Sequence, residues 1–363
     1  MQAINVKFMK HIKCEMQVLQ QNQLDTQSGL KEYSTSMSEN KPDQRRFPPG
    51  SLYRRPSEVS PHVRASTHRK ASSSHLPFQI TGYSIPCERH PQRNEDSFLI
   101  DAASGLMAVF DGVGGSAAGE IASQTAEQAT RQRWKEIKHQ HTRNYHTRQR
   151  LEDCEKVDFC ALLQQLLEYA DEQVRTDGAH RAGTNDLATT VAIGAVCRQG
   201  KNLQMFYAHV GDSRVYLLPE HGALRRLTVD DGLLGRLVEN QMMSEDDARR
   251  IDQAMSSSEL TDLELSYFRH RGGITQALGG PLRPNIHLDS TPIAIGDRVL
   301  LCTDGIHDNL TDEEIEKILR NTPRHQAARS LVEHALLRSR QERHTTIRAK
   351  PDDMTAIVLT RIY

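Results

Sequence analysis

The apolar residues of this 363-residue chain are unevenly distributed. Residues 1–75 hold few apolar clusters and show no sustained periodicity, and residues 45–70 are rich in Ser, Pro and Arg. Such a segment cannot bury enough apolar surface to offset the conformational entropy that folding costs. We therefore predict a disordered extension over residues 1–75 and a folded domain over residues 76–363.

From residue 78 onward, short apolar runs alternate with turn residues and with longer segments of helical periodicity. The short runs predict β-strands over residues 78–84, 97–100, 106–110, 188–196, 203–210, 214–218, 298–303 and 355–362. Periodicity and N-cap signals predict helices over residues 116–138, 159–174 and 326–339, with another helix capped by Thr311. Residues 139–156 are expected to form a loop. Because strands and helices do not alternate strictly, we predict antiparallel sheets covered by helices.

Charge is split along the chain in the same way as apolarity. Residues 1–75 carry 12 Lys and Arg against 6 Asp and Glu, whereas the remainder carries 34 against 41. A basic extension can contact nucleic acid, acidic lipid or its own domain, but a solvated tail is the interpretation we favour, so no nucleic-acid partner is expected. No run approaches the ~18 apolar residues of a membrane span, and charged residues interrupt the N-terminus, so no signal peptide is predicted. We expect a soluble, cytoplasmic protein.

The candidate chemistry lies in acidic residues at the ends of the predicted strands. Asp111 and Asp304 each follow an apolar run and precede a glycine, Asp352 precedes the last strand, and Glu95 with Asp96 precedes an early one. Carboxylates gathered from such distant positions would repel one another strongly unless cations neutralise them. Carboxylate oxygens are the hard ligands that divalent cations prefer, so the pattern predicts a metal site.

The glycine-rich segment that follows Asp111 has a rival interpretation. Residues 112–117 match the G-x-G-x-x-A fingerprint of dinucleotide-binding folds, between a predicted strand and a predicted helix. An aspartate directly before these glycines would repel a pyrophosphate, and Glu95 and Asp96 add further negative charge. An oxidoreductase is therefore the less favoured reading.

Taken together, the motifs from residue 78 to residue 363 resemble the metal-dependent protein serine/threonine phosphatases of type 2C (the PPM family), in their bacterial form. The resemblance is carried by eight segments in the family's order: NEDSF at 94–98, VFDGVGG at 109–115, ATTV at 188–191, HVGDSRVY at 209–216, LTVDD at 227–231, ITQALG at 274–279, CTDG at 302–305 and DDMT at 352–355. It implies a four-layer α/β/β/α sandwich, an α+β fold with two antiparallel sheets flanked by helices. Residues 231–273 would be the flap beside the active site, with Ser244 as the N-cap of one of its short helices.

The resemblance also implies an activity and a ligand set. A metal-bound water at a binuclear Mn²⁺ or Mg²⁺ centre would hydrolyse phosphoserine and phosphothreonine on proteins, opposing serine/threonine kinases. Asp111 would bridge the two cations and, with Asp304, position the water. The remaining ligands would be the Gly112 carbonyl, Glu95, Asp96 and Asp352. For a third cation, which bacterial members often hold, the candidates are Asp186 and Asp231, while the turn at residues 211–214 is interpreted as structural.

The sequence departs from the family at several functional positions, and residues 183–188 are slightly rearranged relative to the family's strand with two threonines. Pro91 stands where the family has its phosphate-binding arginine, so Arg93 or Arg89 would have to replace it. Val113 stands where animal members have a histidine that serves as general acid, and Asp353 replaces the usual asparagine, which makes Asp352 the better ligand candidate. Pro91 keeps open the alternative of an inactive pseudophosphatase that acts as a binding module. Phosphoprotein substrates, a partner kinase and a monomeric state are the expected interactions.

Overall fold

The computed structural model describes residues 77–113, 117–144, 157–184, 187–200, 202–342 and 344–363. The chain divides into two units, and all described residues belong to the unit that spans residues 61–363. The predicted disordered extension over residues 1–75 lies outside the described residues.

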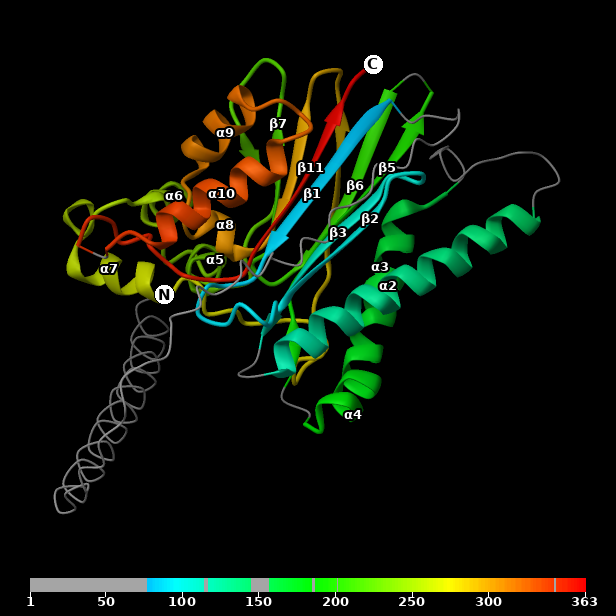
Figure 1. The fold of residues 1–363 in the computed structure, drawn as a ribbon, viewed down its shortest axis with the longest axis horizontal. Helices are drawn as coiled ribbons and strands as arrows, with labels where there is room; N and C mark the ends of the chain where they lie inside the picture. The colour runs from blue at the N-terminus through cyan, green and yellow to red at the C-terminus, as the bar shows by residue number, and fades with distance from the viewer. Residues whose placement is uncertain (1–76, 114–116, 145–156, 185–186, 201, 343) are drawn as a thin grey trace, which may run out of the picture. The chain divides into compact units, whose positions relative to one another are not determined.

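Two antiparallel sheets form the centre of the described domain (Figure 1). The strands of the first sheet, in spatial order, are β1 (Phe78–Ile85), β11 (Met354–Arg361), β10 (Arg298–Cys302), β7 (Arg214–Leu218) and β8 (Arg225–Arg226). Those of the second are β2 (Asp96–Asp101), β3 (Leu106–Val113), β5 (Val191–Gln199), β6 (Asn202–Val210) and β9 (His287–Ile293), with β4 (Ala188–Thr189) paired to β3.

Helices cover the outer face of each sheet. On the second sheet lie α2 (Ala117–Asn144) and α3 (Phe159–Gln173), which is followed by a π-helical turn (Val174–Gly178) and α4 (Ala179–Ala182). On the first sheet lie α8 (Asp304–His307), α9 (Asp312–Asn321) and α10 (Ala327–Ser339). Residues 231–273, the predicted flap, contain the short helices α5 (Leu233–Glu239), α6 (Glu245–Gln253) and α7 (Asp262–Arg269) and a 3₁₀ turn (Ser257–Glu259). The predicted four-layer α/β/β/α sandwich is confirmed.

Strand β3 shows how the layers are fixed by sequence. Leu106, Ala108 and Phe110 pack against the helices, whereas Met107 and Val109 pack against the other sheet. Both faces are therefore buried, which explains why the run is continuously apolar rather than alternating. The alternation directs the next odd-numbered residue, Asp111, toward the space between the two sheets.

Most predicted elements are present, with local differences. The capping signals are confirmed, since the Ser244 side chain accepts from the Asp247 N–H and Thr311 forms a capping box with Glu314. The prediction of a loop from residue 139 was wrong for residues 139–144, which extend α2; the rest of that loop, residues 145–156, lies outside the described residues. Strand β9 was missed because it is polar and contains Pro292, which a strand at the edge of a sheet tolerates. Among the described helices, none has the length and apolarity needed to cross a membrane.

Candidate metal centre

Two aspartates meet at the ends of β2 and β3. Asp96 and Asp111 lie directly opposite each other in the antiparallel register. Asp96 is buried, and its Oδ1 has no hydrogen-bond partner. A buried carboxylate oxygen without a donor is costly, and a bound cation is one way to satisfy it.

The ends of β10 and β11 bring two further aspartates to the same place. Asp304 is the first residue of α8, directly after β10, and Asp352 lies just before β11. Thr303 ties the two sheets together, because its Oγ1 donates to Asp96 Oδ2 at 2.8 Å and its N–H donates to the Thr355 carbonyl at 3.1 Å. Carboxylates from four strand ends therefore form one group, the carboxylate cluster, which consists of Asp96, Asp111, Asp304 and Asp352.

The electrostatics of the cluster show how closely its members interact. Burial, and then the negative charges of Asp304 and Asp96, raise the pKa of Asp111 well above its ordinary value. Burial and then Asp353 do the same for the pKa of Asp96, and burial raises the pKa of Asp304. Without cations the cluster favours bound protons, since desolvation and like charge both disfavour the ionised form.

Each Asp-Gly pair in the cluster needs its glycine for space. A Cβ on Gly112 would lie 2.1 Å from the Gly119 carbonyl oxygen of α2, and a Cβ on Gly305 would lie 1.9 Å from the Asp353 carbonyl oxygen. Both obstacles are backbone atoms that cannot rotate away. The glycines thus allow α2 and the start of β11 to approach the aspartates closely.

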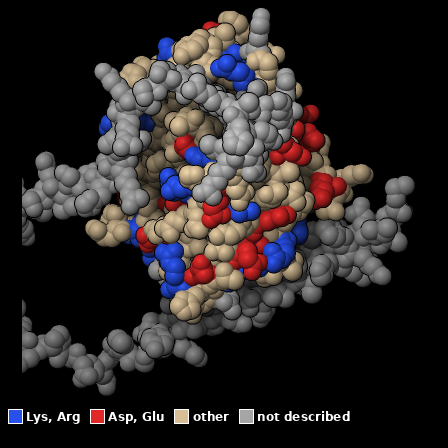
Figure 2. Space-filling model, turned by 90° about the vertical axis from the view of Figure 1, so that its right-hand side faces the viewer, with Lys and Arg blue, Asp and Glu red and all other residues tan. Residues whose placement is uncertain are grey.

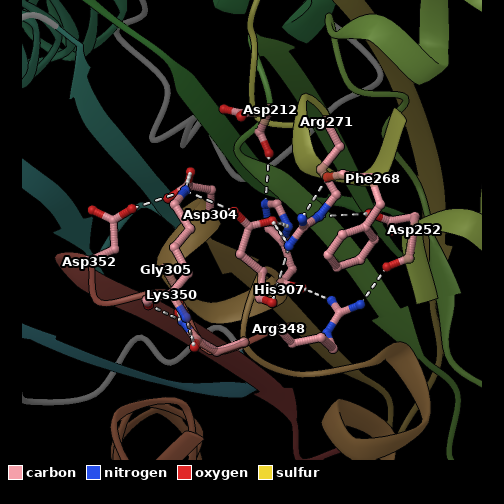
Figure 3. Close-up of polar contacts among 12 residues, drawn as sticks. Asp212, Asp252, Phe268, Arg271, Asp304, Gly305, His307, Arg348, Lys350 and Asp352 are labelled. Carbon is pink, nitrogen blue, oxygen red and sulfur yellow. Dashed lines mark hydrogen bonds and ion pairs between the residues drawn. The ribbon is translucent and has the colours of Figure 1, made fainter. Parts of the chain in front are cut away.

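A lysine that sequence reasoning missed lies within this group (Figure 3). Lys350 Nζ lies 2.5 Å from Asp304 Oδ2, 2.8 Å from Asp308 Oδ2 and 3.0 Å from Asp352 Oδ2. Burial alone would lower the pKa of Lys350, but these three carboxylates raise it well above its ordinary value. The Lys350 ammonium therefore bridges three carboxylates, as a bound metal ion would.

Glu95 and Asp353 lie beside the carboxylate cluster, and their carboxylates have different partners. Both Asp353 carboxylate oxygens accept backbone N–H groups, from Cys87 at 2.6 Å and from Glu95 at 2.7 Å. The Glu95 side chain instead faces Arg93, whose Nη2 lies 3.0 Å from Glu95 Oε1. Asp353 is therefore already occupied in holding the β1–β2 connection, which favours Asp352 over Asp353 as a ligand.

The turn at residues 211–214 was predicted to be structural. This holds for Arg214 but not for Asp212. The buried Arg214 pairs with Asp230 at 2.6 Å and with Asp252 at 3.1 Å, as a structural residue would. Asp212, in contrast, is buried, and its pKa is raised well above its ordinary value by burial and by the charge of Asp304. Asp212 therefore lies within electrostatic reach of the cluster, although the turn gave no local sign of this.

Of the two residues predicted as ligands of a third cation, only Asp231 lies within the described residues. Asp186 lies outside the described residues. Asp231 contacts neither Asp111 nor Asp304; its carboxylate accepts from Gly211 N at 2.8 Å and lies 2.9 Å from His287 Nε2. With His209 and His287 it offers ligand atoms that lie within 4.8 Å of one another, a group that includes nitrogen donors.

Comparison with known proteins agrees with this architecture. The family model described as protein phosphatase 2C matches residues 86–343. The serine/threonine phosphatase stp of Listeria monocytogenes is 27% identical over 216 residues, covering 60% of this chain and 72% of stp. The serine/threonine protein phosphatase PstP of Mycobacterium tuberculosis is 29% identical over 245 residues, covering 67% of this chain and 39% of PstP.

Solved structures show the same fold. The catalytic domain of PstP in complex with two manganese ions superposes with a TM-score of 0.54 and 25% identity, covering 79% of this chain and 99% of that one. The structure of the Mycobacterium tuberculosis serine/threonine phosphatase PstP/Ppp gives a TM-score of 0.58 at 24% identity, over 79% of this chain and 100% of that one. This chain belongs to the protein phosphatase 2C family.

Proposed function

We propose that this protein hydrolyses phosphoserine and phosphothreonine esters on phosphoproteins and thereby opposes serine/threonine kinases. The observation that carries the proposal is the convergence of Asp111, Asp304 and Asp352 in a member of a phosphatase family. The similarity to stp and PstP, both serine/threonine phosphatases by name, supports the substrate class.

The donor atoms support Mn²⁺ or Mg²⁺ as the cofactor, with two cations at the cluster. The proposed ligands are the side chains of Glu95, Asp96, Asp111, Asp304 and Asp352 and the carbonyl of Gly112. All are oxygen donors, which select hard divalent cations over zinc. The two manganese ions in PstP support the same assignment. In this chain the unpartnered Asp96 Oδ1 and the ammonium among three carboxylates both fit a site built for positive charge.

The bound cations would supply Lewis-acid stabilisation of the phosphoryl oxygens and a more acidic water molecule. The chain's own contribution is to fix positions: Asp111 on β3 and Asp304 on α8 would orient the water in line with phosphorus, so no protein nucleophile is required. The side chain of Val113 cannot donate a proton, so water or another group would protonate the leaving alkoxide.

Arg93 is the proposed contact for the substrate phosphate. Its Nη2 lies 3.0 Å from Glu95 Oε1, and about a third of the side chain (32%) is exposed. The exposed part of the guanidinium could therefore contact an incoming phosphoryl oxygen, in place of the arginine that Pro91 replaces. Arg89 is exposed and lines a shallow pocket together with Arg340 and Asp352, which makes it the second choice.

A third cation is also part of the proposal. A third cation would use Asp231, and the neighbouring His209 and His287 would favour an ion that accepts nitrogen ligands.

We also propose a monomeric cytoplasmic protein that acts on the same substrates as a partner kinase and binds no nucleic acid. On the face shown in Figure 2, acidic and basic side chains are interspersed, and no continuous basic stripe is visible there.

The test is hydrolysis of a phosphothreonine peptide with and without Mn²⁺, together with Mn²⁺ binding by calorimetry. We expect turnover that requires Mn²⁺ and is reduced at least about a thousandfold in Asp111→Asn, since that change removes the shared ligand. Folded protein that binds Mn²⁺ but hydrolyses nothing would instead identify a pseudophosphatase.

A further inference from the structure

A second feature with a distinct chemistry is an arginine-lined cavity at the other end of the first sheet. The cavity is open to solvent and has a volume of about 420 Å³, and its charged lining residues are Glu220, Arg298, Arg320, Arg324 and Arg361. Arg298 begins β10, which ends just before Asp304, so the strand separates the cavity from the carboxylate cluster. At about 3.3 Å per residue, the five residues of β10 correspond to a separation of roughly 17 Å.

The positive charge of Arg298 is not neutralised by any carboxylate in the described residues. Its Nη1 donates to two backbone carbonyls, those of Leu319 and, at 2.9 Å, Thr322. Burial, and then the charges of Arg324 and Arg320, lower its pKa. The positive charges of Arg320 and Arg324 therefore repel that of Arg298, which has no carboxylate partner.

Two of the other arginines, Arg361 and Arg324, have donors without an acceptor. Arg361 donates to the Ile293 carbonyl through Nη1, while its Nε is buried and has no acceptor. Arg320 is already engaged, since it pairs with Glu316 at 2.8 Å and donates to the Glu220 carbonyl at 3.3 Å and to the Gly222 carbonyl. Arg324, in contrast, has no ion pair or hydrogen bond with any described residue. The buried Arg361 Nε is unfavourable unless a ligand supplies an acceptor, and the exposed Arg324 guanidinium on the same cavity could contact the same anion.

We propose that this cavity is an anion site that binds a phosphoryl group other than the one being hydrolysed. Guanidinium groups present their N–H donors in a fork that matches the oxygens of phosphate. The concave shape suits a single group rather than the broad surface of a nucleic-acid duplex. Exposed Ile295 and the adjacent Ile362 on its wall would contact the carbon atoms of a phosphorylated side chain.

The experiment uses the full chain freed of divalent cations with a chelator, so that the carboxylate cluster repels phosphate. Binding of inorganic phosphate, of a phosphothreonine peptide and of the same peptide without phosphate is followed by calorimetry and by the melting temperature. We expect both phosphate-bearing ligands to bind and to raise the melting temperature, and the unphosphorylated peptide to do neither.

Arg324→Gln is the test variant, because the side chain is exposed and unpaired and its loss should not affect folding. Its affinity for phosphate should fall about tenfold, the effect of losing one charge-assisted hydrogen bond. Arg249→Gln removes the same charge from an exposed position on α6 and should leave the affinity unchanged. Hydrolysis of a small aryl phosphate with Mn²⁺ should be the same in both variants as in the unmodified protein.

The outcomes separate the sources of the anion. Tighter binding of the phosphopeptide than of inorganic phosphate supports docking of a second phosphorylated residue, whereas equal binding supports capture of free phosphate. If neither ligand binds, or if both variants weaken binding equally, the four arginines are a solvated surface and the proposal is overturned. These results do not depend on whether the protein is an active phosphatase.

Discussion

At the scale of single residues, the ammonium of Lys350 has the greatest consequence for the proposed chemistry. It contacts Asp304, Asp308 and Asp352 at 2.5–3.0 Å. A divalent cation bound to Asp304 and Asp352 would compete for the same oxygen atoms, since their lone pairs are limited and like charges repel. Lys350 should therefore stabilise the cation-free protein and oppose cation binding.

Lys350→Met is expected to have opposite effects on these two properties. The cation-free protein should lose about 1–2 kcal/mol of unfolding free energy, because three carboxylates lose a shared partner that is partly exposed. Affinity for Mn²⁺ should rise about tenfold, because a competing charge is removed. Urea denaturation and calorimetry measure the two effects. Lys317→Met, at an exposed site on α9, is the matched control; an unchanged Mn²⁺ affinity in Lys350→Met would show that the ammonium does not compete.

His307 provides a second prediction at the residue scale, concerning pH. Its Nε2 donates to the Asp212 carbonyl at 3.0 Å, and burial followed by the charge of Arg214 lowers its pKa to about 4. The unfolded chain, with an ordinary histidine pKa near 6.5, then binds more protons than the folded chain between pH 6.5 and pH 4. His307 should thus make the protein less stable as pH falls through this window, by up to about 3 kcal/mol.

His307→Gln keeps a donor for the Asp212 carbonyl but cannot titrate. The unfolding free energy of this variant, measured in urea from pH 7 to pH 4, should fall less steeply than that of the unmodified protein. His221→Gln, at an exposed site, should follow the unmodified curve. Parallel curves for all three proteins would mean that His307 is not held neutral in the folded state.

At the scale of elements, the flap is fastened to the first sheet through buried arginines. The fully buried Arg348 donates to the carbonyls of Asp252 and Ala254 at the end of α6 and to those of His307 and Leu310 around α8. Arg271, near the end of the flap, pairs with Asp308 at 3.0 Å, and its guanidinium lies 3.8 Å from the centre of the Phe268 ring (Figure 3). The flap is therefore held by hydrogen bonds from Arg348 to main-chain carbonyls and by the Arg271–Asp308 ion pair.

Arg348→Met should loosen the flap while leaving the sandwich folded. The substitution leaves four buried carbonyls with fewer donors, and the expected cost is about 3 kcal/mol or more. Hydrogen exchange followed by mass spectrometry should show faster exchange in α6 and α7 and unchanged exchange in β5 and β6. Arg249→Gln, on the exposed side of α6, should leave both regions unchanged. Equal acceleration in β5 and β6 would mean that Arg348 supports the whole domain.

At the scale of the whole molecule, the sequence predicted those features that depend on local pattern. Asp111 and Asp304 could be identified because each follows an apolar run. The order of the predicted elements indicated antiparallel sheets covered by helices, and the resemblance to the type 2C phosphatases implied the four-layer sandwich. Lys350 could not be identified, because its role depends on carboxylates brought together from the two ends of α8 and the approach to β11. The arginine-lined cavity was missed for the same reason: Arg298, Arg320 and Arg361 lie on separate elements and share no motif.

We predict that the folded unit begins near residue 76. Both sheets and all apolar core clusters of the described domain are built from residues after Pro77, whose carbonyl accepts from the Ile362 N–H at 2.7 Å. The low apolar content of residues 1–75 indicates that they add little buried surface. A chain that begins at residue 76 should therefore keep its unfolding free energy within about 0.5 kcal/mol and its Mn²⁺-dependent hydrolysis unchanged. Removing residues 1–85 as well would delete β1, which pairs along its whole length with β11, and should abolish folding. If removal of residues 1–75 alone lowered stability or activity, the basic extension would have to contact the domain, and its interpretation as a solvated tail would be wrong.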